Sequence, residues 1–199
     1  MKQEATLIIL AGGESQRMGQ PKHLLPTSGG TVIGHLIAKL SSLFVETLVV
    51  GGGLQLAGEG FRTVDDVRPE QCPLVGIYSG LCAANTDLAF VLACDLPFVK
   101  PELVQHLLSC AHEADIVVPI VNGYYEPLCA VYRRTANPVI QETLDQGARK
   151  ITEIYDHLRL CKVAEPDIRR FDPELSSFVN LNTPGDLELL SSLRPESVA

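Results

Sequence analysis

The stretch Thr6-Leu7-Ile8-Ile9-Leu10-Ala11-Gly12-Gly13 decides the fold of this chain. Its first five residues are apolar or β-branched, and a glycine pair follows Ala11. A continuous run of this kind is typical of a strand that is covered on both faces of a parallel sheet. We therefore expect a strand near the centre of the sheet. Its carboxyl end should open into the crevice where such sheets bind ligands.

Strand and helix patterns alternate through the chain. Further buried-strand patterns occupy residues 47–50, 61–64, 88–93 and 160–163. Helical spacing of apolar residues occurs at residues 32–40, 74–82, 101–111, 138–147 and 151–158. This alternation predicts a three-layer α/β/α, Rossmann-like fold with a mostly parallel sheet and right-handed crossovers. The loops expected at its ligand-binding edge are residues 11–22, 65–76 and 94–98.

The second half of the chain should add an antiparallel hairpin portion. Residues 116–121 and 124–132 flank Asn122-Gly123, a pair that favours a type I′ turn because both positions tolerate positive φ. Residues 177–181 are expected to form a last strand. Thr183-Pro184 then has the cap and the first-turn proline that begin a terminal helix.

The composition is that of a folded protein of one domain, residues 1–199, with 46% hydrophobic and 20% charged residues. A net charge of -8 argues against nucleic acid as a partner, because a phosphate backbone requires a broad basic face. No apolar run approaches the ~18 residues of a membrane span. Six cysteines without zinc-site spacing indicate free thiols in a reducing cytoplasm.

The loop after the first strand is suited to phosphates. The backbone N–H groups of Gly12 and Gly13 can approach an anion closely. Arg17 can fork onto phosphate oxygens, and Lys22 offers a compact charge suited to an α-phosphate. The loop lacks the Gly-Lys-Ser/Thr of a Walker loop and the spacing of dinucleotide-binding domains. Taken alone, it could equally be a solvated loop.

Two aspartates follow predicted strands. Asp95 comes after residues 88–93, at a carboxyl end where a hard oxygen ligand suits Mg²⁺, although a helix cap or a turn is the alternative. Asp66 could accept the paired N1–H and N2–H₂ donors of guanine. It could also contact ribose or Mg²⁺, or be a solvated turn residue.

The pattern Leu-Ala-Gly-Gly-x-Ser-x-Arg-Met-Gly-x-x-Lys at residues 10–22 resembles the signature of the molybdenum cofactor guanylyltransferase family. This family lies within the α/β nucleotidyltransferases, which also activate sugars. Further matches are Asp65-Asp66, Pro73-Leu74-Val75-Gly76-Ile77, Ala93-Cys94-Asp95-Leu96-Pro97 and Phe178-Val179-Asn180-Leu181-Asn182-Thr183-Pro184. The glycine pair and the Pro-Leu-Val-Gly-Ile stretch resemble the guanylyl branch, so we expect guanine as the base.

The resemblance implies transfer of GMP from GTP to a molybdopterin-type molybdenum cofactor, which forms the guanine dinucleotide and releases pyrophosphate. It implies that Asp95 binds Mg²⁺ and, through it, the triphosphate. The expected catalytic residues are Lys22, Arg17 and Asp95. The expected nucleotide-binding residues are Leu10, Ala11, Gly12, Gly13, Lys22, Asp66 and Asp95.

The acceptor side is expected near the end of the chain. Asn180 and Asn182 flank Leu181 on the predicted last strand, so their side chains should share a face. In the family this segment lies on the pterin side, although Asn182 could instead cap the following helix. The expected partners are GTP and molybdopterin, with transient contacts to molybdoenzymes or cofactor-insertion proteins.

Two other functions remain open from the sequence. One keeps the fold and changes the substrates, giving a cytidylyl- or sugar-phosphate nucleotidyltransferase. The other is a non-catalytic GTP-binding protein that delivers cofactor to an apoenzyme. The first would differ in the nucleotide that it uses, and the second would bind Mg-GTP without releasing pyrophosphate.

Overall fold

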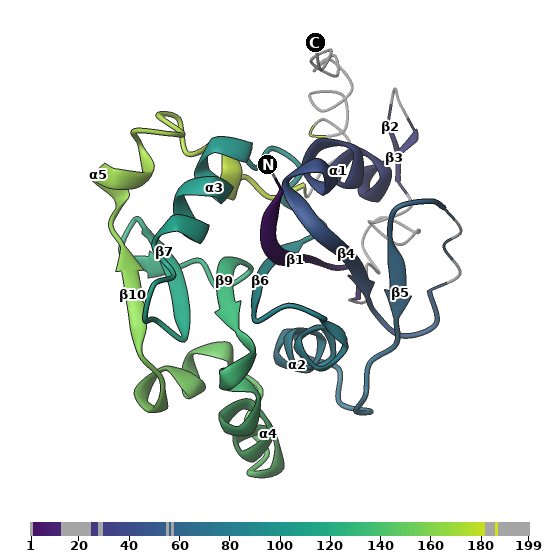
Figure 1. Ribbon diagram of the computed structural model, residues 1–199, viewed down its shortest axis with the longest axis vertical. Coiled ribbons are helices and arrows are strands. Elements are labelled where there is room, and N and C mark those ends of the chain that lie inside the picture. The colour runs from purple at the N-terminus through teal and green to yellow at the C-terminus, as the bar shows by residue number, and fades with distance from the viewer. Residues whose placement is uncertain are drawn as a thin grey trace.

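A computed structural model of the chain describes residues 2–12, 25–27, 30–54, 56, 58–181 and 186 (Figure 1). Four residues expected at the site lie outside the described residues: Gly13, Arg17, Lys22 and Asn182. The expected terminal helix lies outside them as well, apart from Asp186.

One mixed sheet runs through the molecule in the order β10-β7-β9-β6-β1-β4-β5. These strands are β1 (Gln3–Leu10), β4 (Phe44–Val50), β5 (Arg62–Val64), β6 (Leu88–Ala93), β7 (Ile116–Val121), β9 (Cys129–Arg133) and β10 (Leu160–Val163). Strand β8 (Tyr124–Tyr125) pairs with β7, and β2 (Pro26–Thr27) pairs with β3 (Gly30–Thr31) in a small separate sheet. Within the large sheet, β9 runs antiparallel to both β6 and β7, whereas β1, β4, β5 and β6 are mutually parallel. The predicted parallel sheet with an antiparallel portion is therefore confirmed.

Strand β1 is central because it is apolar on both faces. Leu7 and Ile9 lie in one core cluster, whereas Ile8 and Leu10 lie in the other. Thr6 is also buried, and its hydroxyl donates to Glu46 Oε2 at 2.8 Å. A strand without a solvent-facing side must be covered by helices above and below.

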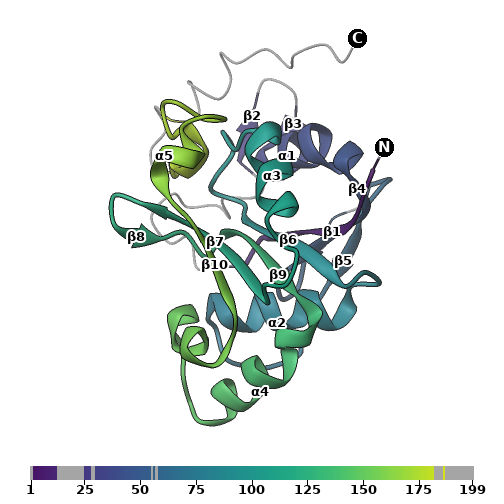
Figure 2. The ribbon, with the colours of Figure 1, turned by 60° about the vertical axis from the view of Figure 1, so that its left-hand side comes forward.

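Helices cover both faces of the sheet and complete the three predicted layers (Figures 1 and 2). Helices α1 (Val32–Leu40) and α3 (Pro101–Ser109) pack on the Leu7 and Ile9 face. Helices α2 (Pro73–Ala83) and α4 (Asn137–Asp145) pack on the Ile8 and Leu10 face. The short helical segments are η2 (Ser41–Leu43), η3 (Arg134–Ala136), η4 (Ile151–His157), α5 (Glu165–Ile168) and η5 (Ser176–Phe178). None of the helices in the described ranges is long and apolar enough to cross a membrane.

The predicted hairpin is confirmed, but its second strand is interrupted. Asn122 and Gly123 have φ values of 51° and 83°, as a type I′ turn requires. Strand β8 nevertheless ends at Tyr125, and β9 begins only at Cys129. Between them Glu126 N donates to Pro119 O and Cys129 N donates to Glu126 O, so the chain bends before it enters the main sheet.

The prediction of a strand at residues 177–181 is wrong. The segment contains the 3₁₀ helix η5 and then irregular chain, because the Asp172 carboxylate accepts the backbone N–H groups of Ser176 and Ser177. Leu175 precedes this turn with a φ of 57°. Asn180 therefore does not stand on a strand, and the reason for expecting it to share a face with Asn182 no longer holds.

We expect Gly80→Ala to destabilise the fold by about 1–3 kcal/mol, because α2 approaches β1 at this residue. A Cβ at Gly80 would lie 2.8 Å from Ile8 Cδ1 and Cγ2. This strain should exceed the roughly 1 kcal/mol that alanine gains over glycine in a helix. Urea unfolding measures the change. Gly34→Ala, at an exposed position of α1 where a Cβ would lie 3.3 Å from Thr31 Oγ1, is the control and should leave stability unchanged or raise it by up to about 1 kcal/mol. Equal effects of the two substitutions would contradict this account of α2 packing.

Candidate active site at the carboxyl ends of the parallel strands

The ends of four parallel strands are level with one another. Leu10 pairs with Val50 on one side and with Ala93 on the other, and Val50 pairs with Val64. The pairing continues one residue further, since Ala11 N donates to Val50 O at 2.8 Å and Cys94 N to Leu10 O at 3.0 Å. The residues that follow these strands therefore leave the sheet at one edge. Those singled out from the sequence are Gly12, Asp66 and Asp95.

The loops after β1 and β4 approach each other closely. A Cβ at Gly51 would lie 2.9 Å from Gly12 N, so the two backbones nearly touch. Leu10 and Ala11 are buried, whereas Gly12 is exposed. Of the described residues expected to line a nucleotide from this loop, Gly12 is thus the first that solvent can reach. The backbone turn, more than the Leu10 side chain, is presented to the crevice.

Asp95 follows β6 in a turn and is half-buried. Its backbone carbonyl accepts a hydrogen bond from Leu181 N at 2.7 Å. The chain around Asn180 is therefore held beside Asp95, although the two lie far apart in the sequence. Sequence analysis assigned Asp95 and Asn180 to the site but did not predict the hydrogen bond from Leu181 to Asp95.

The segment after Asp95 is braced by two other parts of the chain. Lys39 Nζ of α1 donates to Pro97 O at 3.4 Å. Lys100 N donates to Ser177 Oγ at 3.0 Å. Phe98 and Leu181 also share a small buried cluster. The turn that carries Asp95 is thus fixed from α1 and from residues 177–181.

The buried carboxylate of Asp172 holds the segment that contains Ser177, the partner of Lys100. Asp172 is 1% exposed, and its Oδ1 accepts from Ser176 N at 3.1 Å and from Ser176 Oγ at 3.0 Å. Its Oδ2 accepts from Ser177 N at 2.7 Å. Burial alone would raise the pKa of Asp172, but the hydrogen bonds from Ser177 and Ser176 outweigh it and hold the pKa below its usual value. Sequence analysis missed this residue. An aspartate four and five positions before two serines is the local turn pattern that could have indicated it.

Asp66 stands at the other side of the site, after β5. Burial raises the pKa of its carboxyl, a hydrogen bond from the Gly52 backbone opposes this, and the neighbouring Asp65 adds to the rise. Asp65 itself accepts from Gly53 N at 3.2 Å and ties the β4 and β5 loops together. Asp66 thus offers a half-buried acceptor to a ligand with N–H donors.

Sheet geometry separates Asp66 from Asp95. They follow β5 and β6, which are three strand spacings apart in the sheet, or about 14 Å at the usual distance between strands. One Mg²⁺ holds its ligands at about 2 Å. The two carboxylates are therefore placed for different parts of an extended ligand, not for one metal ion.

The described side chains fit a metal that arrives with its substrate. Among them, no three His, Cys, Asp or Glu residues gather in a way that could hold an ion. Magnesium ions are commonly bound through one or two carboxylates together with substrate phosphates and water. Asp95, a single acidic side chain at the crevice, suits that mode of binding.

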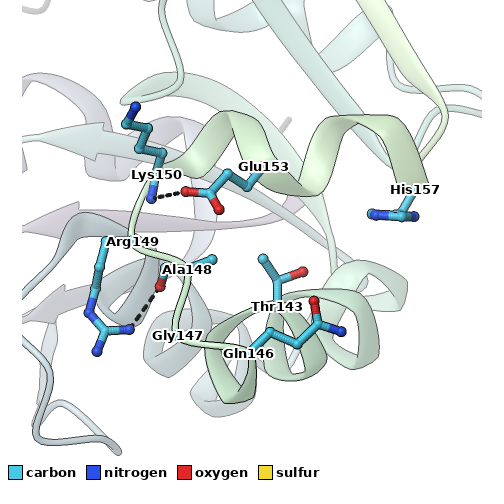
Figure 3. A pocket seen from close by; sticks show the side chains of 8 residues that line it. All are labelled: Thr143, Gln146, Gly147, Ala148, Arg149, Lys150, Glu153 and His157. Atoms are coloured by element: carbon cyan, nitrogen blue, oxygen red, sulfur yellow. Dashed lines mark hydrogen bonds between the residues drawn. The ribbon is translucent and has the colours of Figure 1, made fainter.

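An open pocket of about 440 Å³ lies between the end of α4 and η4 (Figure 3). It is lined by Thr143, Gln146, Gly147, Ala148, Arg149, Lys150, Glu153 and His157. Within it, Lys150 N donates to Glu153 Oε1 at 3.0 Å, and Arg149 Nη1 donates to Ala148 O at 2.9 Å. None of the described site residues expected from the sequence lines this pocket.

Known proteins match the chain over most of its length. The sequence model of a family described as "MobA-like NTP transferase domain" matches residues 7–160. The molybdenum cofactor guanylyltransferase of Desulfosudis oleivorans is 37% identical over 186 residues, which cover 92% of each chain. A probable molybdenum cofactor guanylyltransferase of Pelotomaculum thermopropionicum is 36% identical over 188 residues, which cover 92% of this chain and 90% of the relative.

Solved structures show the same architecture. Molybdopterin-guanine dinucleotide biosynthesis protein A of Archaeoglobus fulgidus superposes with a TM-score of 0.78 at 28% identity, covering 94% of this chain and 96% of that protein. The 2-C-methyl-D-erythritol 4-phosphate cytidylyltransferase of Thermus thermophilus superposes with a TM-score of 0.68 at 16% identity, covering 92% and 96%. At 16% identity, the similarity to the cytidylyltransferase shows the fold alone. Together they confirm the predicted nucleotidyltransferase fold.

We expect Asp172→Asn to destabilise the protein by about 1–3 kcal/mol at pH 7, because buried N–H and hydroxyl donors lose a charged acceptor. The folded-state pKa of Asp172 lies below its ordinary value. Its contribution is therefore present above pH about 4 and is lost as the pH falls through the folded pKa. The difference between variant and wild type should shrink on acidification, as measured by urea unfolding from pH 7 to pH 3.

The exposed Asp167, which pairs only at 4.0 Å with Arg170, provides the matched control. Asp167→Asn should change stability by less than about 0.5 kcal/mol at any of these pH values. A penalty at Asp172 that does not depend on pH would show that its ionised form is not what stabilises the turn.

Proposed function

The chain belongs to the MobA-like NTP transferase family, and we propose that it transfers GMP from GTP to molybdopterin or its molybdenum-loaded form. The products are the guanine dinucleotide of the cofactor and pyrophosphate. The observation that carries this proposal is the common edge at which Gly12, Asp66 and Asp95 leave their strands. That edge offers a backbone turn for phosphates, a carboxylate for a base and a carboxylate for a metal.

In the proposed reaction, a terminal phosphate oxygen of the acceptor attacks the α-phosphorus of GTP. A new P–O bond forms, and the bond from the α-phosphorus to the bridging oxygen breaks as pyrophosphate leaves. Such a displacement depends on positioning and charge stabilisation, not on a protein nucleophile. We assign charge stabilisation to Lys22 and Arg17 and triphosphate binding to Gly12 and Gly13, of which Lys22, Arg17 and Gly13 lie outside the described residues. Leu10 and Ala11 are assigned to line the nucleotide.

Asp95 is the residue that we assign to Mg²⁺. A bound Mg²⁺ would offset the negative charge that develops on the triphosphate. The protein's own part is to hold the Asp95 turn still, through the hydrogen bond from Leu181 and the brace at Lys100. A carboxylate that is already in place loses little freedom when the metal-bound nucleotide arrives.

We assign the guanine end of GTP to Asp66. Its distance of about three strand spacings from Asp95 suits a nucleotide that extends from base to phosphates along the sheet edge. At this distance from Asp95, Asp66 is better placed to bind the base than to bind Mg²⁺. Asn180 is assigned to the acceptor, because residues 180 and 181 lie beside the Asp95 turn. Asn182, outside the described residues, is assigned to the acceptor from the family resemblance.

We place the reaction in the cytoplasm, with possible transient hand-over of product to molybdoenzymes or cofactor-insertion proteins. None of the six cysteines, all within the described ranges, forms a disulfide, which supports a reducing compartment. The whole chain would serve as one nucleotidyltransferase domain.

The deciding experiment is incubation of the protein with Mg-GTP and molybdopterin, with pyrophosphate and dinucleotide measured together. Parallel reactions with CTP, UTP and ATP, and with sugar phosphates as acceptors, test the other transferase reactions. Formation of the guanine dinucleotide with equal release of pyrophosphate supports the proposal. Tight Mg-GTP binding without any pyrophosphate would instead identify a cofactor-delivery protein.

We expect Lys22→Ala and Asp95→Asn each to lower kcat by about 100-fold or more, since each removes charge stabilisation at the reacting phosphates. Single-turnover measurements at saturating GTP report the change. Asp156→Asn, at an exposed position of η4, is the control and should retain wild-type rates. Wild-type binding and transfer by Lys22→Ala would remove that residue from the mechanism.

We expect Asp66→Asn to abolish discrimination between GTP and ITP, which lacks the 2-amino group of guanine. The carboxylate can accept both the N1–H and N2–H₂ donors, whereas an amide offers one acceptor and one donor. Losing a hydrogen bond to a charged group costs about 1.5–3 kcal/mol, so KM for GTP should rise at least tenfold. A variant with raised KM for both nucleotides and an unchanged preference would indicate a ribose contact instead.

A further inference from the structure

Glu126 is a shielded carboxylate without a hydrogen-bond or ion-pair partner among the described residues. It is half-buried between β8 and β9, and burial raises its pKa. Its backbone is fixed, because Glu126 N donates to Pro119 O at 3.0 Å and Glu126 O accepts from Cys129 N at 3.2 Å. In the described part of the chain, other shielded acidic side chains have partners, as Glu46 has Arg62 and Asp115 has Arg159.

The strand register places Glu126 beside the Asp95 turn. Leu92 pairs with Cys129 across the antiparallel β6 and β9, and Ala93 N donates to Leu128 O at 2.9 Å. The chain turns just before Cys129, where Glu126 bonds back to Pro119 of β7, so Glu126 lies at the amino end of β9. Both carboxylates therefore leave neighbouring strands at the same edge of the sheet, although 30 residues of sequence lie between them.

The turn that carries Glu126 and the segment that carries Asp172 and Leu175 both lie near Cys129. The pKa of the buried Cys129 thiol is raised by burial and, in addition, by the charges of Glu126 and Asp172. Cys129 and Leu175 belong to the same core cluster, which packs under α1 and α3. Glu126 and the segment that leads to Asn180 are therefore both near the amino end of β9.

The order of the strands places Glu126 in the part of the crevice that we assign to the acceptor. Along the edge, Asp66 follows β5, Gly12 follows β1, Asp95 follows β6, and Glu126 precedes β9. A nucleotide with its base at Asp66 and its phosphates at Gly12 and Asp95 occupies the β5-to-β6 part. The β9 part then remains for the molecule that attacks the α-phosphate.

We propose that the Glu126 carboxylate binds the pterin ring of the acceptor, accepting hydrogen bonds from its 2-amino group and the adjacent ring N–H. This inference rests on the function proposed above. Two parallel donors match the two oxygens of a carboxylate, and the resulting charge-assisted bonds are strong. A half-buried carboxylate without donors is unfavourable in the free protein, and the pterin supplies the donors that the fold does not.

The test compares Glu126→Gln with wild type in steady-state transfer. The KM for molybdopterin should rise at least tenfold, while the KM for GTP and the Mg²⁺ concentration for half-maximal rate stay within twofold of wild type. Glu142→Gln, at an exposed position of α4, is the matched control and should change neither KM. An altered Mg²⁺ requirement with an unchanged molybdopterin KM would overturn the proposal and make Glu126 a metal ligand.

A binding measurement separates failure of this inference from failure of the proposed function. Molybdopterin is titrated into each protein in the presence of Mg²⁺ and a GTP analogue with a methylene group between the α- and β-phosphates, and pterin fluorescence is followed. Weaker binding by Glu126→Gln supports the inference even without turnover. Equal binding by the two proteins overturns it. Binding by wild type without transfer of GMP from GTP would overturn only the proposed function.

Folding of the variant is checked by thermal melting. Removing an unpaired, half-buried charge should leave Tm equal to that of wild type or higher. A lower Tm would show that the ionised carboxylate stabilises the free protein, which contradicts the absence of a partner within the described residues.

Discussion

The pairing of β1 with both β4 and β6 is the constraint on which the rest of the structure depends. Leu10 stands opposite Val50 and Ala93, so three strands end at one level. A slip by one residue would move Leu7 and Ile9 to the α2 side and Ile8 and Leu10 to the α1 side, and neither core would fit. The hydrophobic cores therefore hold the strand ends in line. The loops at those ends acquire their mutual positions from buried side chains that never touch a ligand.

The sheet alone does not fix the Asp95 turn. The turn is held by Leu181 and, through Ser177 and Lys100, by a part of the chain that carries the buried Asp172. A buried carboxylate is stable here because serine N–H and hydroxyl donors replace the water it loses. Residues 172–181 thus act as a support for the Asp95 turn. They also join the region assigned to the metal to the region assigned to the acceptor, which a strand at residues 177–181 would not have done.

The sequence predicted those features that local pattern determines. The apolar runs of β1, β4 and β6, the positive φ values at Asn122-Gly123 and the helices over both faces follow from side-chain periodicity and turn chemistry. Three features depend on contacts between distant residues and could not be read locally: the insertion of β9 between β6 and β7, the hydrogen bond from Leu181 to Asp95, and the shielding of Glu126. The prediction of a strand at 177–181 was wrong for the same reason. The backbone N–H groups of Ser176 and Ser177 donate to Asp172 and so are not available for strand pairing. The roles of Lys22, Arg17, Asp66 and Asp95 stay predictions, supported by where the described members lie.

The order of strands also sets the order of the reactants. In-line displacement requires the attacking oxygen and the leaving pyrophosphate to lie on opposite sides of the α-phosphorus. With the base at β5 and the α-phosphate between β1 and β6, the attacking phosphate must come from the β9 side or from above the crevice. Residues 176–181 pack against the loop that follows Asp95, and the chain before β9 brings Glu126 to the same edge of the sheet. In the proposed complex, the antiparallel β9 follows the part of the sheet that binds the nucleotide and forms one side of the binding site for the second substrate.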